Sequence, residues 1–115
     1  MIQPGEVLER LEAVILSRRA EAADRSYTSR LLAGGVAKIG GKVTEEAGEL
    51  VAAAAGETDD RVVSEAADLL YHTLVLLAAR DLRLSAVEAE LARRFGVSGL
   101  DEKAARPPKP APEKP

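Results

Sequence analysis

The chain has 115 residues, a length typical of one domain whose small core would gain from a partner subunit. Its net charge of −3 argues against a nucleic-acid-binding surface, and its lack of cysteine excludes disulfides, thiolate metal sites and thiol nucleophiles. Aromatic residues make up only 3%, and Ala, Leu and Val carry most of the apolar content, which favours packed helices over a β-sandwich or barrel.

Apolar residues recur at helical spacing through the first half of the chain. The pattern predicts a helix over residues 6–23 and a short helix over residues 27–33. Gly34-Gly35 then predicts a turn. A second long helix follows over residues 36–55, where the apolar side chains form one stripe.

The next segment, residues 60–79, is apolar on almost every side, which is typical of a buried helix. A chain this small cannot enclose such a helix, so we expect dimerisation to complete the core. A last helix is predicted over residues 86–95, and the prolines beyond it predict an unstructured tail. We therefore expect an all-α bundle of four to five helices in one domain over residues 1–100, with a disordered tail over residues 101–115.

Two acidic motifs lie on the second long helix and on the helix that follows it. The first is Glu45-Glu46-x-x-Glu49 and the second is Glu65-x-x-Asp68. Residues three apart are neighbours on a helix surface, so each motif contributes one pair of adjacent carboxylates. If the two helices form an antiparallel hairpin through their apolar stripes, both pairs converge on one pocket.

Four carboxylates in one pocket need a strong positive charge. Two of them at about 5 Å repel by roughly 3 kcal/mol at an effective dielectric constant near 20. Lys38 and Lys42 offset part of this charge, whereas a divalent cation also attracts a polyphosphate. Oxygen ligands favour Mg²⁺ first and Mn²⁺ second. The chemistry indicated is hydrolysis of a phosphoanhydride, in which a carboxylate orients or deprotonates the attacking water.

The arrangement E-E-x-x-E followed by E-x-x-D resembles the signature of the MazG-like all-α nucleotide pyrophosphohydrolases. More specifically, the chain is similar to the phosphoribosyl-ATP pyrophosphohydrolases, which act in the second step of histidine biosynthesis. The segments that carry this likeness are SYTSRLL (residues 26–32), KIGGKVTEE (38–46), ADLLYH (67–72) and GVSGLDEK (96–103).

The resemblance implies a homodimeric helical bundle that converts phosphoribosyl-ATP to phosphoribosyl-AMP and pyrophosphate with Mg²⁺. The catalytic metal ligands that it implies are Glu46, Glu49, Glu65 and Asp68. We expect substrate contacts at Tyr27, Lys38, Lys42 and Glu45. The pair Gly40-Gly41 departs from the family, which has bulkier helix formers there, and we expect a kink or a close helix contact at this point.

Several of these side chains also have ordinary structural explanations. Lys42 has acids three and four residues further along its helix, so a surface ion pair explains it as well as a phosphate contact. Lys38 fits a solvated lysine equally well. Tyr27 either packs at a helix start or touches the substrate. His72 fits a core or supporting histidine better than a metal ligand.

Two other functions remain alternatives: a house-cleaning pyrophosphohydrolase that acts on noncanonical nucleoside triphosphates, and a non-catalytic dimeric helical module. The N-terminus lacks the layout of a signal peptide, and the apolar run over residues 69–79 is too short to span a bilayer. We therefore expect a cytoplasmic protein that has a nucleotide substrate, no nucleic-acid partner and no membrane partner.

Overall fold

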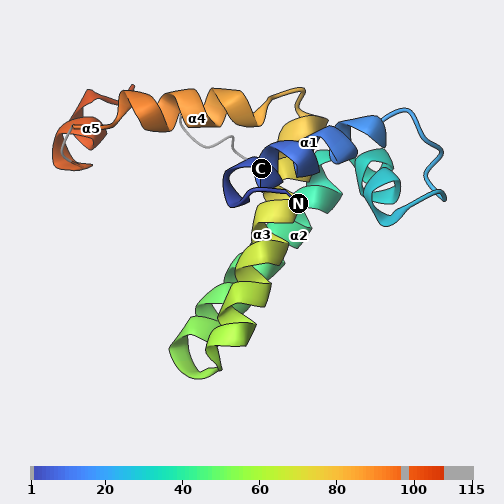
Figure 1. Cartoon of the computed structure of the whole chain (residues 1–115), viewed down its shortest axis with the longest axis horizontal. Coiled ribbons are helices and arrows are strands. Elements are labelled where there is room, and N and C mark those ends of the chain that lie inside the picture. Colours follow the sequence, from blue (N-terminus) through green and yellow to red (C-terminus); the bar gives the residue numbers. More distant parts are fainter. Residues whose placement is uncertain (1, 97–98, 108–115) are drawn as a thin grey trace, which may run out of the picture. The chain divides into compact units, whose positions relative to one another are not determined.

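The computed structural model describes residues 2–96 and 99–107, with only the backbone of Glu102, and every regular element in these ranges is helical. This confirms the predicted all-α fold class. The elements are a 3₁₀ turn η1 (Pro4–Glu6) and the helices α1 (Val7–Ser17), α2 (Tyr27–Gly56), α3 (Asp59–Ala79), α4 (Leu84–Arg93) and α5 (Gly99–Ala105) (Figure 1). The chain divides into two compact units after Leu84, and the acidic motifs lie in the first unit.

The first unit is built on an antiparallel hairpin of α2 and α3, with α1 against α3 at the end where α2 begins (Figure 1). The buried apolar side chains gather at this end and come from all three helices: Ile15, Leu31, Ile39, Leu74, Val75 and Ala78. The hairpin extends beyond this core toward its loop at residues 57–58, and the acidic motifs lie on that extension.

The first turn of α2 is closed by a capping box. The Ser26 hydroxyl accepts a hydrogen bond from the backbone N–H of Ser29 at 3.0 Å, and the Ser29 hydroxyl accepts one from the Ser26 backbone N–H at 2.9 Å. Each side chain thereby satisfies a backbone donor that the helix leaves unpaired. This fixes where Tyr27 and the rest of α2 begin.

The turn predicted at Gly34-Gly35 is present as a kink inside α2. Gly35 has φ 81° and ψ −178°, a conformation that is almost restricted to glycine. The expectation for Gly40-Gly41 was wrong, because their backbone is helical and a Cβ on either would meet no atom within 4 Å. The two glycines therefore cause neither a kink nor a close helix contact in the described chain.

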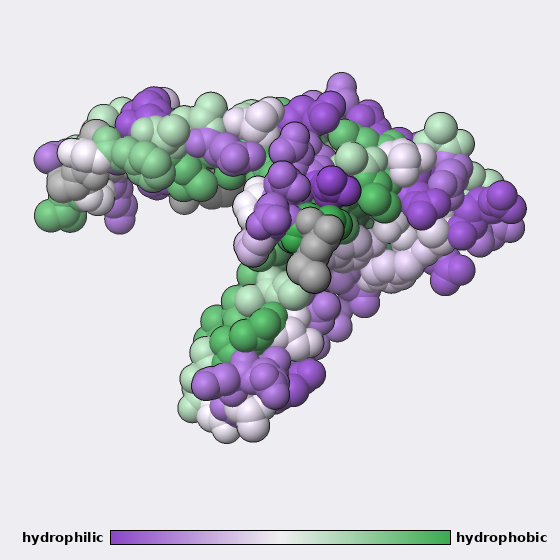
Figure 2. Space-filling view, in the orientation of Figure 1, coloured by the Kyte–Doolittle hydropathy of each residue, from purple (hydrophilic) through white to green (hydrophobic). Residues whose placement is uncertain are grey.

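Within one chain the third long helix is not buried on all sides, as expected of a helix that so small a chain cannot enclose. In α3 the buried residues are confined to one face, and Val63 is 68% and Leu70 49% exposed. On α2, Val51 is 70% exposed, and Figure 2 shows hydrophobic side chains on the extension of the hairpin. By length and composition alone α3 could cross a bilayer, but core helices of soluble proteins meet the same criteria.

Several helix ends differ from the predictions. The first helix ends at Ser17 instead of residue 23. The chain makes a turn at residues 18–20, before the capping box at the start of α2. Residues 101–105 belong to α5, although a tail was predicted to begin at residue 101. The proline-rich part of that predicted tail, residues 108–115, lies outside the described residues.

Glu12 was not predicted to have any role, yet it is only 7% exposed and joins distant parts of the first unit. Its Oε2 accepts a hydrogen bond from the backbone N–H of Leu84 at 2.6 Å, and its Oε1 faces Arg83 Nε at 3.5 Å. The carboxylate thus satisfies the first free N–H of α4, where the helix dipole also favours a negative charge.

The contrast between two glycines of α2 gives a test of this backbone. Gly41→Ala should raise the free energy of unfolding by up to about 1 kcal/mol, because the residue is helical and its surroundings are open. Gly35→Ala should lower it by about 1–3 kcal/mol, because alanine is strained at φ 81°. Urea unfolding followed by circular dichroism measures both changes. A Gly41→Ala variant less stable than the parent would contradict the helical backbone and open surroundings of Gly41.

Candidate active site

Three acidic side chains of the hairpin meet where α2 and α3 face each other. One carboxylate oxygen from each of Glu46, Glu49 and Glu65 lies within 4.8 Å of the other two. Glu46 and Glu49 are one helical turn apart on α2, and Glu65 reaches them from α3. The structure therefore brings together three of the four predicted metal ligands.

These three carboxylates differ in their access to solvent. Glu65 is only 3% exposed, Glu46 is half-buried and Glu49 is exposed. When all three carboxylates are ionised, Glu46 Oε2 and Glu65 Oε2 are both buried and have no hydrogen-bond partner in the described chain. Leaving a buried acceptor unsatisfied costs about 1–3 kcal/mol, and more when the group is charged. Two such oxygens in one group mark a place for a proton or a cation.

The crowding shifts the protonation of the group. Hydrogen bonding to Glu65, followed by repulsion from Glu46, raises the pKa of Glu49 from 4.5 to about 7. Burial, followed by a hydrogen bond with Glu65, raises the pKa of Glu46. Without a cation, a proton held among these carboxylates relieves part of their repulsion near neutral pH. A divalent cation with oxygen preference would take the place of that proton.

Arg61 is a member of the site that the sequence analysis did not single out. Its Nη2 donates a hydrogen bond to Glu65 Oε1, and its Nε faces Glu57 Oε1 at 3.4 Å. The signal was available, because Arg61 and Glu65 are four residues apart on one helix. A guanidinium whose side chain is 54% exposed cannot neutralise three carboxylates, so the group keeps a strong negative potential.

Asp68, the fourth predicted ligand, lies beside this group and not within it. Its side chain is exposed, one turn after Glu65 on α3. Its charge contributes to the raised pKa of Glu46, so the two carboxylates act on each other electrostatically. Its role as a ligand remains a prediction.

The residues predicted to touch the substrate all lie on α2, from its first residue, Tyr27, to Glu45. Lys42 Nζ lies 3.6 Å from Glu45 Oε2, which is the surface pair expected from their spacing. The stem of Lys38 lies over Gly34, one turn earlier, where a Cβ would collide with it. The Tyr27 hydroxyl lies near enough to Lys42 and the acids after it to interact with them electrostatically.

His72 is buried and hydrogen-bonded, as expected for a core or supporting histidine. It is 6% exposed, and its Nε2 lies 2.9 Å from the Tyr27 hydroxyl. Tyr71 stacks on Tyr27 with ring centroids 6.2 Å apart and forms a short hydrogen bond with the Thr28 hydroxyl. This aromatic cluster joins the start of α2 to α3.

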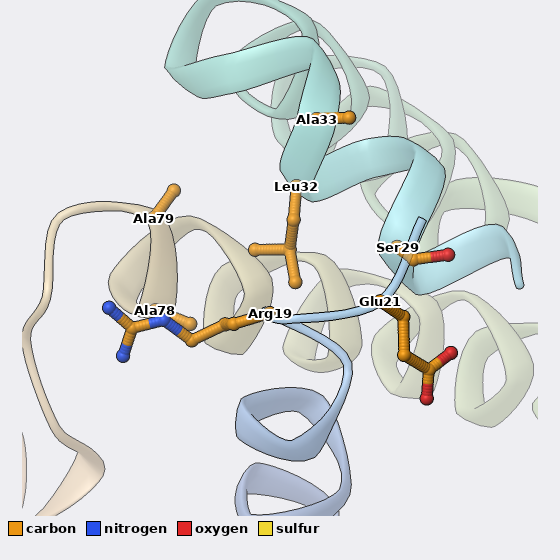
Figure 3. Close-up of a pocket in the computed structure, with 7 residues that line it drawn as sticks. All are labelled: Arg19, Glu21, Ser29, Leu32, Ala33, Ala78 and Ala79. Carbon is orange, nitrogen blue, oxygen red and sulfur yellow. The ribbon is translucent and has the colours of Figure 1, made fainter. Parts of the chain in front are cut away.

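A separate pocket of about 240 Å³ lies between the segment that follows α1, the start of α2 and the end of α3 (Figure 3). Its polar side chains already have partners. Arg19 pairs with Asp81 at 3.1 Å, Glu21 pairs with Arg18 at 2.8 Å, and Ser29 belongs to the capping box. The pocket therefore lacks the unsatisfied groups that distinguish the carboxylates of the hairpin.

Comparison with known proteins gives matches over nearly the whole first unit and α4. Residues 8–95 match the sequence model of the family described as phosphoribosyl-ATP pyrophosphohydrolase. The phosphoribosyl-ATP pyrophosphatase of Trichlorobacter lovleyi is 58% identical over 100 residues, which cover 87% of this chain and 93% of that protein. The protein of the same name from Erythrobacter litoralis is 54% identical, over 86% of this chain and 95% of its own length. The one from Pelobacter propionicus is 47% identical, over 92% of this chain and 98% of its own length.

The raised pKa of Glu49 predicts how stability without metal depends on pH. The folded protein holds this proton up to about pH 7, whereas the usual value is 4.5, so the folded state binds more protons between these values. The melting temperature in EDTA should therefore fall as the pH rises through this window. Glu49→Gln should flatten the fall, whereas Asp60→Asn, an exposed acid of α3, should leave it unchanged. A profile that is the same in all three proteins would contradict the coupling.

Proposed function

Because this chain belongs to the phosphoribosyl-ATP pyrophosphohydrolase family, we propose that it hydrolyses phosphoribosyl-ATP to phosphoribosyl-AMP and pyrophosphate, the second step of histidine biosynthesis. It is thus a hydrolase that acts on a phosphoanhydride bond of a small nucleotide. The observation that carries the assignment of its active site is the group of Glu46, Glu49 and Glu65, with its two unsatisfied buried oxygens.

Glu46, Glu49, Glu65 and Asp68 would hold Mg²⁺, with Mn²⁺ as the alternative. The donors fit such an ion because all of them are carboxylate oxygens, which hard divalent cations prefer. The two buried oxygens without partners support the same assignment. Mg²⁺, when bound, neutralises charge on the phosphates and on the leaving pyrophosphate.

The carboxylates differ in what each can do for the reaction. Glu65 is buried and hydrogen-bonded to Arg61, so its position is fixed and it suits a purely structural ligand. Glu49 and Asp68 are exposed, so an attacking water can reach them. One of these two orients that water and takes its proton.

Lys42 is the cation best placed for the phosphates. Its ion pair with Glu45 is long and exposed, and such pairs contribute about 0–1 kcal/mol, so a phosphate can replace it at little cost. Until a phosphate binds, Glu45 keeps Lys42 close to the site. Lys38 extends the positive charge one turn toward Tyr27, where the rest of the substrate would lie.

A second copy of the chain would cover the exposed apolar faces of the hairpin. Val51 and Val63 are exposed by about two thirds, and Val36 and Leu70 by about half. Each fully buried aliphatic side chain contributes about 1.5–3 kcal/mol, so leaving these in water forfeits much of the stability that this small chain has available. We propose a homodimer formed through α2 and α3. We also place this biosynthetic enzyme in the cytoplasm.

The substrate assignment predicts which nucleotide is cleaved fastest. Pyrophosphate release should have a higher kcat/KM with phosphoribosyl-ATP than with ATP, dATP or dUTP when all are measured side by side with Mg²⁺. The non-catalytic alternative predicts no release from any of them. A preference for a simple triphosphate would overturn the pathway assignment and leave the carboxylate site standing.

The metal assignment predicts the effect of two neutral substitutions. Glu49→Gln and Asp68→Asn should each lower kcat by about 100-fold or more, because each removes a charged ligand without changing the side-chain size. Circular dichroism should show unchanged helix content. Asp60→Asn is the matched control on α3 and should keep normal turnover. Normal turnover of the Glu49 and Asp68 variants would refute the site.

The dimer assignment predicts the mass of the protein in solution. Sedimentation equilibrium should give twice the chain mass of 12.2 kDa at micromolar concentration. Val63→Glu should produce monomers, because it places a charge in the proposed contact of the hairpin. Val14→Glu is the matched control, since Val14 is a 49% exposed valine of α1. A monomeric wild-type protein would exclude the dimer.

A further inference from the structure

The hydrogen bond between Tyr27 and His72 has fixed donor and acceptor roles. His72 Nδ1 lies 2.9 Å from the backbone carbonyl oxygen of Asp68, which can only accept, so Nδ1 carries the proton. Nε2 is then the acceptor nitrogen of the ring, and the Tyr27 hydroxyl donates to it at 2.9 Å. The imidazole is only 6% exposed, so water does not compete for these contacts.

The proton of Tyr27 is therefore already committed, and its oxygen can only accept a further hydrogen bond. The residue is 48% exposed, so part of it remains accessible to a ligand. Its ring is held by stacking on Tyr71, which is itself hydrogen-bonded to Thr28. The Tyr27 oxygen is thus held in one position and can act toward a ligand only as a hydrogen-bond acceptor.

The hydrogen bonds of His72 place the Tyr27 oxygen one turn from Asp68 on α3, because the same ring bonds the Asp68 backbone and Tyr27. Lys42, Glu45 and Glu46 also act on the Tyr27 hydroxyl electrostatically. A phosphate offers oxygen acceptors and negative charge, so an oxygen that only accepts, within the influence of two carboxylates, does not suit it. A group that donates a hydrogen bond does suit it. In a nucleotide the donors nearest to the phosphates are the hydroxyls of the sugar.

We propose that Tyr27 determines specificity by accepting a hydrogen bond from a sugar hydroxyl of the nucleotide substrate, and that His72 is a positioning residue that directs this acceptor. This inference rests on the proposed function, because it assumes that phosphates bind at the carboxylates and Lys42. His72 acts through Tyr27 by binding its proton and does not touch the substrate.

Steady-state kinetics with phosphoribosyl-ATP test the sugar contact. Tyr27→Phe should raise KM about five- to tenfold and leave kcat within about twofold, since it removes one hydrogen bond made equally before and during the reaction. Tyr71→Phe is the matched control, because it removes a hydroxyl from the neighbouring ring, and it should leave KM unchanged. With a substrate analogue lacking the contacted sugar hydroxyl, wild type and Tyr27→Phe should have the same KM.

A double-substitution comparison tests whether His72 acts through Tyr27. His72→Leu should raise KM less than Tyr27→Phe does, and the combination should be no worse than Tyr27→Phe alone. His72→Gln carries an amide oxygen that can accept from Tyr27, so it should recover part of the loss. Additive effects of His72→Leu and Tyr27→Phe, or an equal rise in KM with Tyr71→Phe, would overturn the proposal.

The donor and acceptor roles can be measured without any substrate. The chain has one histidine, so ¹⁵N spectra of the imidazole report on His72 alone. They should show the proton on Nδ1, and Tyr27→Phe should shift the Nε2 signal. A proton on Nε2 would overturn the proposal.

The two proposals can fail separately. If wild-type protein does not hydrolyse phosphoribosyl-ATP, the proposed function fails, while the imidazole spectra still decide the hydrogen bond. Because such a protein leaves phosphoribosyl-ATP intact, its binding of this nucleotide with Mg²⁺, compared between wild type and Tyr27→Phe, still decides the sugar contact. Equal affinity of the two proteins in that titration would refute it.

Discussion

The mutual repulsion of three carboxylates that the hairpin holds together is the constraint on which the rest of this structure depends. Glu46 and Glu49 are fixed by the turn of one helix, and Glu65 is buried against them on the other. Glu65 is buried, so it cannot move away without separating α2 from α3, whereas Glu49 is exposed. The apolar core around Ile39 and Val75 lies toward the other end of the hairpin, so the folding energy gained there holds the acids in an arrangement they would not adopt alone.

Neighbouring groups offset only part of this repulsion, and the site can therefore still bind a cation. Arg61 offsets part of the charge of Glu65, the most buried acid, and a proton retained by the group offsets part of the rest. Glu49 is exposed and can release that proton to solvent near neutral pH. If protein cations and protons neutralised all three carboxylates, the site would bind a metal ion weakly. If nothing neutralised them, their repulsion would destabilise the hairpin. The observed arrangement lies between these limits.

The local features of this arrangement were predictable and the long-range ones were not. Helical spacing placed Glu46 beside Glu49, and Gly34-Gly35 marked the kink, because both depend on residues within one turn. The contact of Glu12 with Leu84 joins residues 72 apart, and no periodicity reports such a contact. The apolar pattern of α3 and the short length of the chain indicated that one subunit leaves part of this helix bare, but not which of its residues stay exposed. Helix α5 was missed because the prolines that follow dominated the composition.

The proposed dimer interface and the candidate active site are connected, because the exposed apolar residues and the acids lie along the same stretch of the hairpin. Val51 lies two residues after Glu49, and Val63 lies two residues before Glu65. Residues two apart point to nearly opposite sides of a helix, so a partner that covers these valines would leave the carboxylates on the other side accessible to water. The second subunit would therefore act on the site through the hairpin itself. By completing the core it would hold α2 and α3 together against the repulsion among the acids, while a cation and a nucleotide could still reach them.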